Sequence, residues 1–267
     1  MSTIDINDRL VLYGYGVFET LRVTEEQIEV PELHYERMKR GAEALELTLP
    51  EYSIWLGKIR DIVKSEQSFE PYALRVTLSG GAARKEPSSQ LIHHVRPIPY
   101  TAADYQDGVN ICILTHPRNE YSPCVHIKST NIIENLLAKN EATNQGAREG
   151  IWINTKGYLV EGTVSNLFFV KNEVLYTPSL ECGCLPGTRR LIVIECARRL
   201  GIPVREGRFI RAHLEGADEV FLTNALMGLL PVRNVENHLK PFNSLKADSM
   251  TTQLRKSYEE FVHTNAI

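Results

Sequence analysis

Short runs of alternating apolar and polar residues, separated by segments with helical spacing, fill the first hundred positions of the chain. The runs LVLYG and GVFETLRV, with QIEV after a polar turn, predict paired strands. Two apolar stripes follow at the spacing of helices, the first ended by Pro50. The expected elements are strands at 9–30, 72–81 and 91–100 and helices at 31–49 and 51–65. This pattern is typical of a compact α+β unit.

The second half of the chain starts with the stretch KSTNIIENLLAKNEA, whose apolar residues predict a helix that opens at Lys128. Short runs separated by turn residues then predict antiparallel strands. A further helix is expected at 188–200, because Gly201 follows it directly and Pro203 stands just beyond. The remaining expected elements are strands at 151–154, 158–162, 166–171, 174–178 and 219–224 and an amphipathic helix near 244–262.

The segment HPRNEYSPC at 116–124 has two prolines and little periodicity, which is typical of a connector. We therefore expect a small N-terminal α+β domain at 1–115 and a larger C-terminal domain at 125–267. A chain of 267 residues with 43% apolar residues can bury the cores that two such domains need.

Charge and hydropathy narrow the class of ligand. The net charge of −3 comes from interspersed acids and bases, which favours a small-molecule ligand over nucleic acid or a membrane. The N-terminal stretch MSTIDINDRL has no apolar core of the signal-peptide kind, and no window approaches 18 apolar residues. We expect a cytoplasmic protein.

The five cysteines form no CxxC pair, so the sequence predicts free thiols and neither a disulfide framework nor a zinc site. The ECGC stretch at 181–184 is best interpreted as a loop. His93 and His94 are adjacent, so a strand would direct them to opposite faces and they could not share one ion. No metal is expected.

Four separated features carry candidate chemistry. They are Lys128, Glu161 in VEGTVSN, the helix-start motif LPGTRR at 185–190, and FLTNALMG at 221–228, where small Ala225 follows a strand end. A helix start offers free N–H groups and a positive dipole end to an anion, and the second turn could add donors. A lysine, an acid and such a phosphate cradle are what pyridoxal 5'-phosphate (PLP) requires of a protein.

The same segments, in this order, resemble the class IV, or fold type IV, PLP enzymes. This family includes branched-chain aminotransferases, D-amino-acid aminotransferases and aminodeoxychorismate lyases. The resemblance runs through NDRLVLYGYGVFETLRV, HYERM, KSTNIIENLLAKNEA, EGTVSNLFFVKNEVLYTP, LPGTRR and EVFLTNALMGLLPV. It implies a small N-terminal α+β domain, a larger C-terminal pseudobarrel domain, and a homodimer whose subunits complete one another's sites.

Carried to matching positions, the resemblance implies a role for five residues. Lys128 would form the Schiff base with PLP, and Glu161 would face the pyridine nitrogen. Arg37 in HYERM, Thr188 and Asn224 would contact the phosphate. Without the resemblance, Arg37 would be interpreted as a solvated arginine on a helix.

The resemblance favours the lyase chemistry. TNALMGLLPV is similar to the lyase version of this segment, and the Arg-x-His pair of D-amino-acid aminotransferases is missing at Arg84. Some transaminases place a phenol at positions matching Phe18 or Ile133, and neither residue here can donate. We expect conversion of aminodeoxychorismate to 4-aminobenzoate and pyruvate, on the pathway to folate. A branched-chain or D-amino-acid aminotransferase is the alternative, and a non-catalytic PLP-binding protein is a remote one.

Arginines are the candidate ligands of a substrate carboxylate, because a guanidinium fork suits that geometry. Arg84 and Arg75 are the two candidates, both at or after the strand expected at 72–81. Many relatives have Gly-Asp-Gly where this chain has Gly14, Tyr15 and Gly16, so Tyr15 could alter the mouth of the pocket.

Overall fold

The computed structural model describes residues 4–66, 68, 70–82, 89–236 and 241–267. The chain divides into two compact units, which are described separately below. Unit 1 comprises Met1–Pro99, Ile127–Ile132 and Val262–Ile267, and unit 2 comprises Tyr100–His126 and Ile133–Phe261. This division differs from the expected boundaries at 115 and 125, since the whole segment 116–124 belongs to unit 2.

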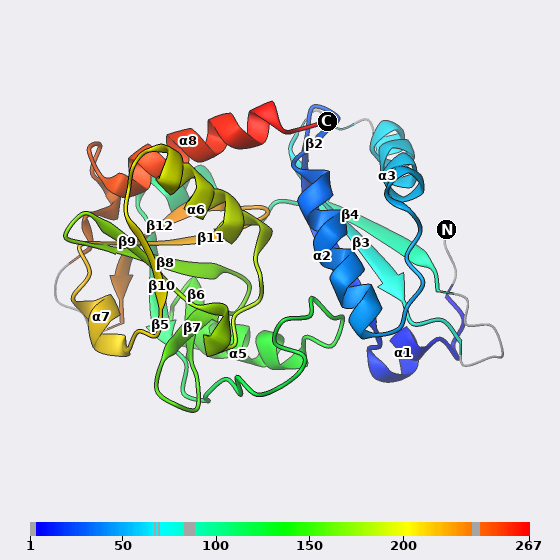
Figure 1. Ribbon diagram of the computed structural model, residues 1–267, viewed down its shortest axis with the longest axis horizontal. Coiled ribbons are helices and arrows are strands. Elements are labelled where there is room, and N and C mark those ends of the chain that lie inside the picture. The colour runs from blue at the N-terminus through cyan, green and yellow to red at the C-terminus, as the bar shows by residue number, and fades with distance from the viewer. Residues whose placement is uncertain (1–3, 67, 69, 83–88, 237–240) are drawn as a thin grey trace. The chain divides into compact units, whose positions relative to one another are not determined.

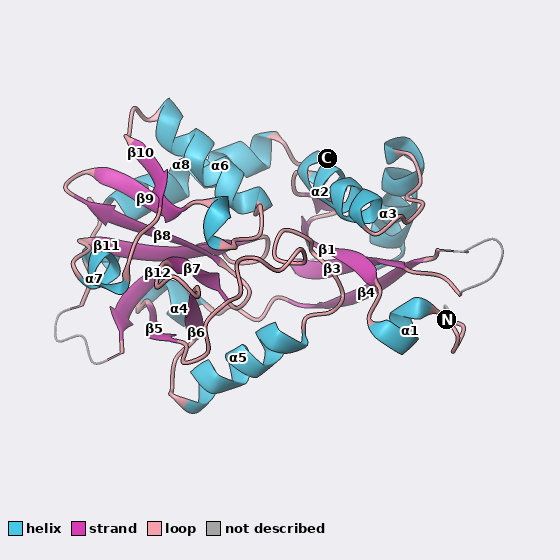
Figure 2. Cartoon of the chain, turned by 60° about the horizontal axis from the view of Figure 1, so that its bottom comes forward, coloured by secondary structure: helices cyan, strands magenta, loops and turns pink. Residues whose placement is uncertain are grey.

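Unit 1 is built on a four-stranded antiparallel sheet with the strand order β2-β1-β3-β4 (Figures 1 and 2). Its elements are α1 (Arg9–Tyr13), β1 (Gly16–Thr24), β2 (Gln27–Ile28), α2 (Pro31–Ala44), α3 (Tyr52–Glu66), β3 (Tyr72–Ser79) and β4 (Leu91–Pro97). One face of the sheet packs against α2 and α3 through side chains that alternate along the strands. Buried members of this core include Leu21, Val23, Met38, Trp55, Ile59, Leu74 and Leu78.

The expected strand at LVLYG is wrong, because residues Arg9–Tyr13 form the short helix α1. The Asp8 side chain caps its start by accepting a hydrogen bond from the Leu10 N–H at 2.8 Å. Gly14 ends it in the left-handed conformation at φ 65°, which glycine adopts at little cost. Capping at both ends therefore outweighs the apolar run that resembled a strand.

Unit 2 contains an eight-stranded mixed sheet with the order β10-β9-β8-β11-β12-β5-β6-β7. The strands are β5 (Val109–Ile113), β6 (Glu149–Ile153), β7 (Leu159–Gly162), β8 (Asn166–Lys171), β9 (Val174–Pro178), β10 (Val204–Gly207), β11 (Glu219–Asn224) and β12 (Gly228–Val235). Strand β7 at one edge also lies close to β8 and β9, so the sheet curls on itself. This curled sheet is the pseudobarrel that the family resemblance implied.

Helices lie around this sheet (Figures 1 and 2), and all belong to unit 2 except the end of the C-terminal helix from Val262. They are α4 (Ala102–Gln106), α5 (Ile133–Asn144), α6 (Thr188–Arg199), α7 (Arg211–Glu215) and α8 (Met250–Thr264), with single 3-10 turns η1 (Leu180–Cys182) and η2 (Asn243–Leu245). The helix expected at 188–200 is confirmed as α6, and Gly201 follows it at φ 70°. The C-terminal helix begins later than expected. Within the described ranges, every helix is too short or too polar to cross a membrane.

Candidate active site

Lys128 lies in an extended segment beside β1, and the expectation that it opens a helix is wrong. The Phe18 N–H donates to the Lys128 carbonyl at 3.0 Å, and the Thr130 N–H donates to the Gly16 carbonyl at 2.9 Å. Helix α5 begins only at Ile133. The backbone position of Lys128 is therefore set by strand-like pairing with β1, and the dipole of α5 does not bear on it.

The Lys128 side chain lies over an aromatic ring that it shares with an arginine. Its Nζ is 4.5 Å from the centroid of the Phe18 ring, and the Arg75 Cζ is 3.5 Å from the same centroid. The two cationic groups are therefore no more than about 8 Å apart, the sum of these distances. Burial and the neighbouring charge of Arg96 lower the pKa of Arg75. Arg84, the other carboxylate candidate, lies outside the described residues.

Arg37 is held by a buried acid rather than by solvent. Its Nε donates to Glu19 Oε1 at 2.7 Å and its Nη2 donates to Glu19 Oε2 at 2.6 Å. Burial alone would raise the pKa of Glu19, but the charges and hydrogen bonds of Arg37 and His34 lower it to about 2. The ionised carboxylate only accepts, so His34 donates to it through Nδ1 at 2.6 Å.

Glu161 lies on β7 with a side chain that is almost fully buried. Its Oε2 accepts a hydrogen bond from the Leu185 N–H at 3.0 Å. Burial, followed by the charge of Glu161, raises the pKa of the Cys184 thiol well above its ordinary value. The Cys184 thiol is therefore neutral. The Glu161 carboxylate is hydrogen-bonded to Leu185, in the segment that leads into α6.

The start of α6 is buried and has no side-chain cap. Gly187 occupies the capping position without a side chain to accept a hydrogen bond, and Thr188, Arg189 and Arg190 are 3%, 1% and 3% exposed. The first turn of an α-helix leaves its N–H groups without partners inside the helix. A buried helix start of this kind fits a bound anion.

Asn166 of β8 joins the start of α6 to the end of β11. Its Nδ2 donates to the Thr223 carbonyl at 2.8 Å, and a Cβ atom added at Gly187 would lie 2.1 Å from its Oδ1. A side chain at position 187 would therefore displace the Asn166 amide. The Thr223 hydroxyl is buried and has no hydrogen-bond partner among the described residues. An unsatisfied buried hydroxyl beside a buried helix start is consistent with a phosphate cradle.

Asn224 organises the turn between β11 and β12. Its Nδ2 donates to the Tyr100 hydroxyl at 3.1 Å and to the Val164 carbonyl at 3.0 Å. Its Oδ1 accepts from the Leu226 and Met227 N–H groups, both at 2.9 Å. All four hydrogen-bonding positions of the amide are thus used, and the side chain fixes the turn that contains Ala225.

Each unit, taken by itself, holds groups whose chemistry fits a part of PLP. In unit 1, Lys128 is an amine on a fixed segment and Arg37 is a buried, oriented guanidinium. In unit 2, Glu161 is a buried carboxylate, and the start of α6 with the Thr223 hydroxyl can accept an anion. Among the residues that the structure describes, no group of three or more His, Cys, Asp or Glu side chains gathers as a metal site.

Several residues of this arrangement were not predicted from the sequence. Glu19, His34 and Asn166 position the predicted residues, whereas Gly187 belongs to the LPGTRR motif already selected. One signal was present for Glu19, because it occupies the buried register of β1 together with Val17. An acid in an otherwise apolar register requires a buried partner.

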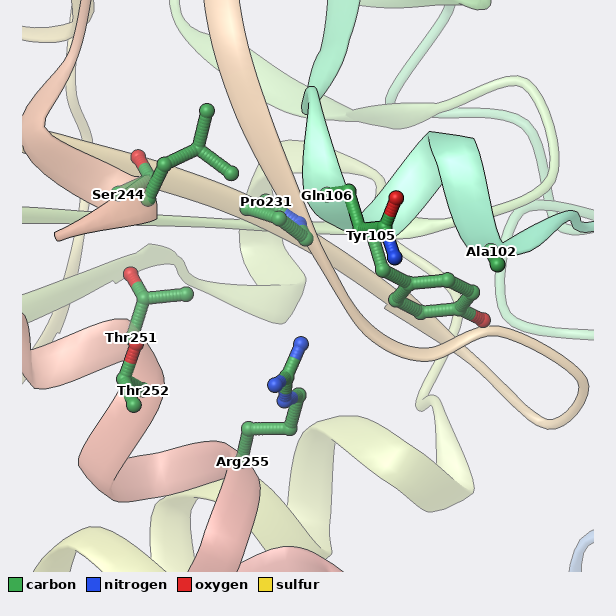
Figure 3. A pocket seen from close by; sticks show the side chains of 9 residues that line it. Ala102, Tyr105, Gln106, Pro231, Ser244, Thr251, Thr252 and Arg255 are labelled. Atoms are coloured by element: carbon green, nitrogen blue, oxygen red, sulfur yellow. The ribbon is translucent and has the colours of Figure 1, made fainter. Parts of the chain in front are cut away.

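A pocket of about 400 Å³ in unit 2 does not include any of the predicted site residues (Figure 3). Arg255 of α8 reaches into it from one side, and Tyr105 of α4 lies on the other. The residues that line it are Ala102, Tyr105, Gln106, Pro231, Ser244, Leu245, Thr251, Thr252 and Arg255. We assign no part of the PLP site to this pocket.

Known proteins with the same organisation include both lyases and aminotransferases. The aminodeoxychorismate lyase of Bacillus subtilis is 28% identical over 264 residues, covering 96% of this chain and 90% of that protein. A D-alanine aminotransferase of Staphylococcus aureus is also 28% identical, over 276 residues, covering 100% of this chain and 95% of that protein. A solved structure from Legionella pneumophila, assigned as a 4-amino-4-deoxychorismate lyase, has a TM-score of 0.87 and 28% identity, covering 96% of both chains.

The family is determined more firmly than the reaction. Identities of 28% to a lyase and to an aminotransferase do not distinguish the two activities. The family model described as amino-transferase class IV matches residues 16–235, which is most of the chain. Members of this family depend on PLP. With its curled sheet and a family model that matches most of its length, the chain belongs to the class IV aminotransferase family of PLP enzymes.

Proposed function

We propose that this protein is a PLP-dependent lyase that converts 4-amino-4-deoxychorismate to 4-aminobenzoate and pyruvate. The reaction removes the proton from the ring carbon that carries the amine. It then breaks the bond between the neighbouring ring carbon and the enolpyruvyl oxygen, and the released enolpyruvate gains a proton to become pyruvate. The ring becomes aromatic in the process, so no oxidant and no second substrate are required.

When bound, PLP supplies an electron sink for the carbon that carries the amine. Lys128 would form the covalent link to the cofactor, and its free amine would take the proton from that carbon and return it to the departing enolpyruvate. By the family resemblance, Glu161 would face the pyridine nitrogen of the cofactor. Arg37, Thr188 at the first turn of α6, and the turn at Ala225 would hold its phosphate.

The lyase assignment depends most on the turn that Asn224 organises. The four hydrogen bonds of its amide shape the TNALM segment, and a glycine, serine or threonine at this position could not form all of them. This segment resembles the lyase version of the family. The Bacillus subtilis lyase and the Legionella pneumophila protein, each 28% identical to this chain, support the same assignment.

An aminotransferase that acts on D- or branched-chain amino acids is the second candidate. The 28% identity to a D-alanine aminotransferase along the full chain favours it. Phe18, which lies beside Lys128, has no hydroxyl, so it cannot provide the phenol that some transaminases place at this position. This difference, together with the turn at Asn224, ranks the lyase first.

One assay separates the candidates. Purified, PLP-loaded protein is incubated with 4-amino-4-deoxychorismate, and separately with pairs of amino and keto acids. The proposal predicts equal amounts of 4-aminobenzoate and pyruvate. Fast amino transfer without an aromatic product would reject the lyase and identify an aminotransferase. No product in either reaction would favour a non-catalytic PLP-binding protein.

The biological setting belongs to the same proposal. A role in folate biosynthesis follows from the product 4-aminobenzoate and a homodimer from the family resemblance, and a cytoplasmic location is the expectation from the hydropathy of the sequence. Sedimentation of the purified protein measures whether it is a homodimer. We expect a particle with twice the mass of the 30.3 kDa chain.

A further inference from the structure

The second face of the sheet in unit 1 is polar and basic, in contrast to the face that packs on α2 and α3. Strand alternation and register place Phe18 and Arg22 of β1 on this face, with Arg75 of β3. Strand β4 adds His94, directly opposite Arg75, and Arg96, opposite Ala73. Among the described residues of β1 to β4 no aspartate or glutamate lies on this face, and Glu29, just after β2, lies opposite Arg22.

Arg75 and Arg96 have no acidic partner within the part of the chain that the structure describes. The Arg75 Nε makes one long hydrogen bond, to the Thr77 hydroxyl at 3.4 Å, and the described residues offer no hydrogen bond or ion pair to Arg96. The two side chains are close enough for the charge of Arg96 to lower the pKa of Arg75. Arg22 differs from them, because its Nε lies 3.4 Å from a carboxylate oxygen of Glu29.

Two neighbouring guanidinium groups with no anion between them repel each other. An anionic ligand bound by both groups would offset this repulsion. Arg75 is half-buried against Phe18, and Lys128 lies over the same ring. An anion held by Arg75 and Arg96 would therefore be attached to the molecule that reacts at Lys128. Carboxylates match the planar fork of arginine.

We propose that Arg75 and Arg96 together form a subsite for a carboxylate of a substrate that carries two carboxylates, with Arg96 as a specificity-determining residue. The subsite deepens the proposed function and rests on it for the identity of the substrate, since 4-amino-4-deoxychorismate is a dicarboxylate. Arg22, on the same face but paired with Glu29, does not take part.

The test measures binding without turnover. Chorismate has both carboxylates but a hydroxyl in place of the reacting amine, so it binds without reacting at Lys128. Its affinity for PLP-loaded protein is measured by calorimetry for the wild type, Arg75→Gln, Arg96→Gln, the double variant and the matched control Arg22→Gln. Thermal melting checks that each variant is folded.

We expect Arg75→Gln and Arg96→Gln each to weaken chorismate binding about tenfold, the effect of losing one charge-assisted hydrogen bond. The double variant should lose less than the product of the two effects, because both arginines hold the same carboxylate. Arg22→Gln should bind as the wild type does.

Wild-type affinity in Arg96→Gln, equal losses in Arg96→Gln and Arg22→Gln, or no chorismate binding to the wild type would each overturn the subsite. Failure of the proposed function gives a different result. In that case no 4-aminobenzoate forms in the product assay, while chorismate binding still depends on Arg75 and Arg96 and not on Arg22.

Discussion

Glu19 and Arg37 form a two-point ion pair in the interior of unit 1, with Nε to Oε1 at 2.7 Å and Nη2 to Oε2 at 2.6 Å. The Glu19 side chain is fully buried and that of Arg37 is 7% exposed. One edge of the guanidinium is therefore fixed by the acid. The orientation of the remaining donors, which we propose face the phosphate of PLP, is set by the same pair.

Glu19→Gln should destabilise the protein by about 3–5 kcal/mol, because it leaves the Arg37 charge buried without its carboxylate. Urea unfolding of the PLP-free protein measures this loss directly. Glu29→Gln serves as the control, since it removes a partly exposed partner of Arg22 and should cost less than about 1 kcal/mol. Equal losses of unfolding free energy in the two variants would mean that the buried pair stabilises the protein no more than the partly exposed pair does.

The same pair predicts a dependence of stability on pH. Folding lowers the pKa of Glu19 from 4.5 to about 2, so its contribution is present above the unfolded value and is lost as pH falls toward the folded value. A shift of this size corresponds to about 3 kcal/mol, of which roughly 2 kcal/mol is lost by pH 3. The gap in stability between wild type and Glu19→Gln should therefore narrow from pH 6 to pH 3. A gap that stays constant would contradict the assigned pKa.

Gly187→Ala should weaken the phosphate cradle. The new Cβ would lie 2.1 Å from Asn166 Oδ1 and would push this side chain away from the Thr223 carbonyl. Overpacking of this kind costs about 1–3 kcal/mol, which we expect to appear as a loss of PLP affinity of roughly tenfold or more. Titration with PLP, followed by its visible absorption, measures the effect.

Gly57→Ala is the matched control for this substitution. Gly57 lies within α3, and an added Cβ would meet nothing within 4 Å. The change should stabilise α3 by about 0.5–1 kcal/mol and leave PLP affinity as it is. If both variants bound PLP as the wild type does, the start of α6 would not be the phosphate site.

Asn224→Ser should lower the kcat/KM of the lyase reaction roughly 10- to 100-fold, corresponding to about 1–3 kcal/mol for hydrogen-bonding groups left unpaired. The smaller side chain cannot bridge Tyr100, Val164 and the following turn together. The formation of 4-aminobenzoate is the measurement. Asn119→Ser, at an exposed asparagine that accepts from the Tyr121 N–H, should leave the rate unchanged. Full activity in Asn224→Ser would show that the reaction does not depend on the four hydrogen bonds of the Asn224 amide.

Elements with local signals could be predicted from the sequence. Helix α6 is bounded by Gly187 and Gly201, and the turn between β8 and β9 uses Asn172 and Glu173 at φ 49° and 60°. The backbone conformation at such helix ends and tight turns is determined by residues that are close in the sequence. The helix and the turn predicted from the sequence therefore agree with the structure.

Features that depend on distant pairing could not be predicted in this way. Strand β5 joins the sheet of unit 2 through parallel pairing with β6 and β12, which no local pattern encodes. The segment at Lys128 resembled a helix start, although its backbone pairs with β1. The contact between Glu19 and Arg37 likewise requires the position of α2 on the sheet, so the sequence offered both residues without their relationship.

Lys128 is the residue that we propose binds PLP covalently. Reduction of the PLP-loaded protein with borohydride, followed by proteolysis and mass spectrometry, locates the cofactor on a particular lysine. We expect a pyridoxyl group on the peptide that contains Lys128, and none in Lys128→Ala. A pyridoxyl group on another lysine of the wild type, or on none, would show that Lys128 is not the attachment site.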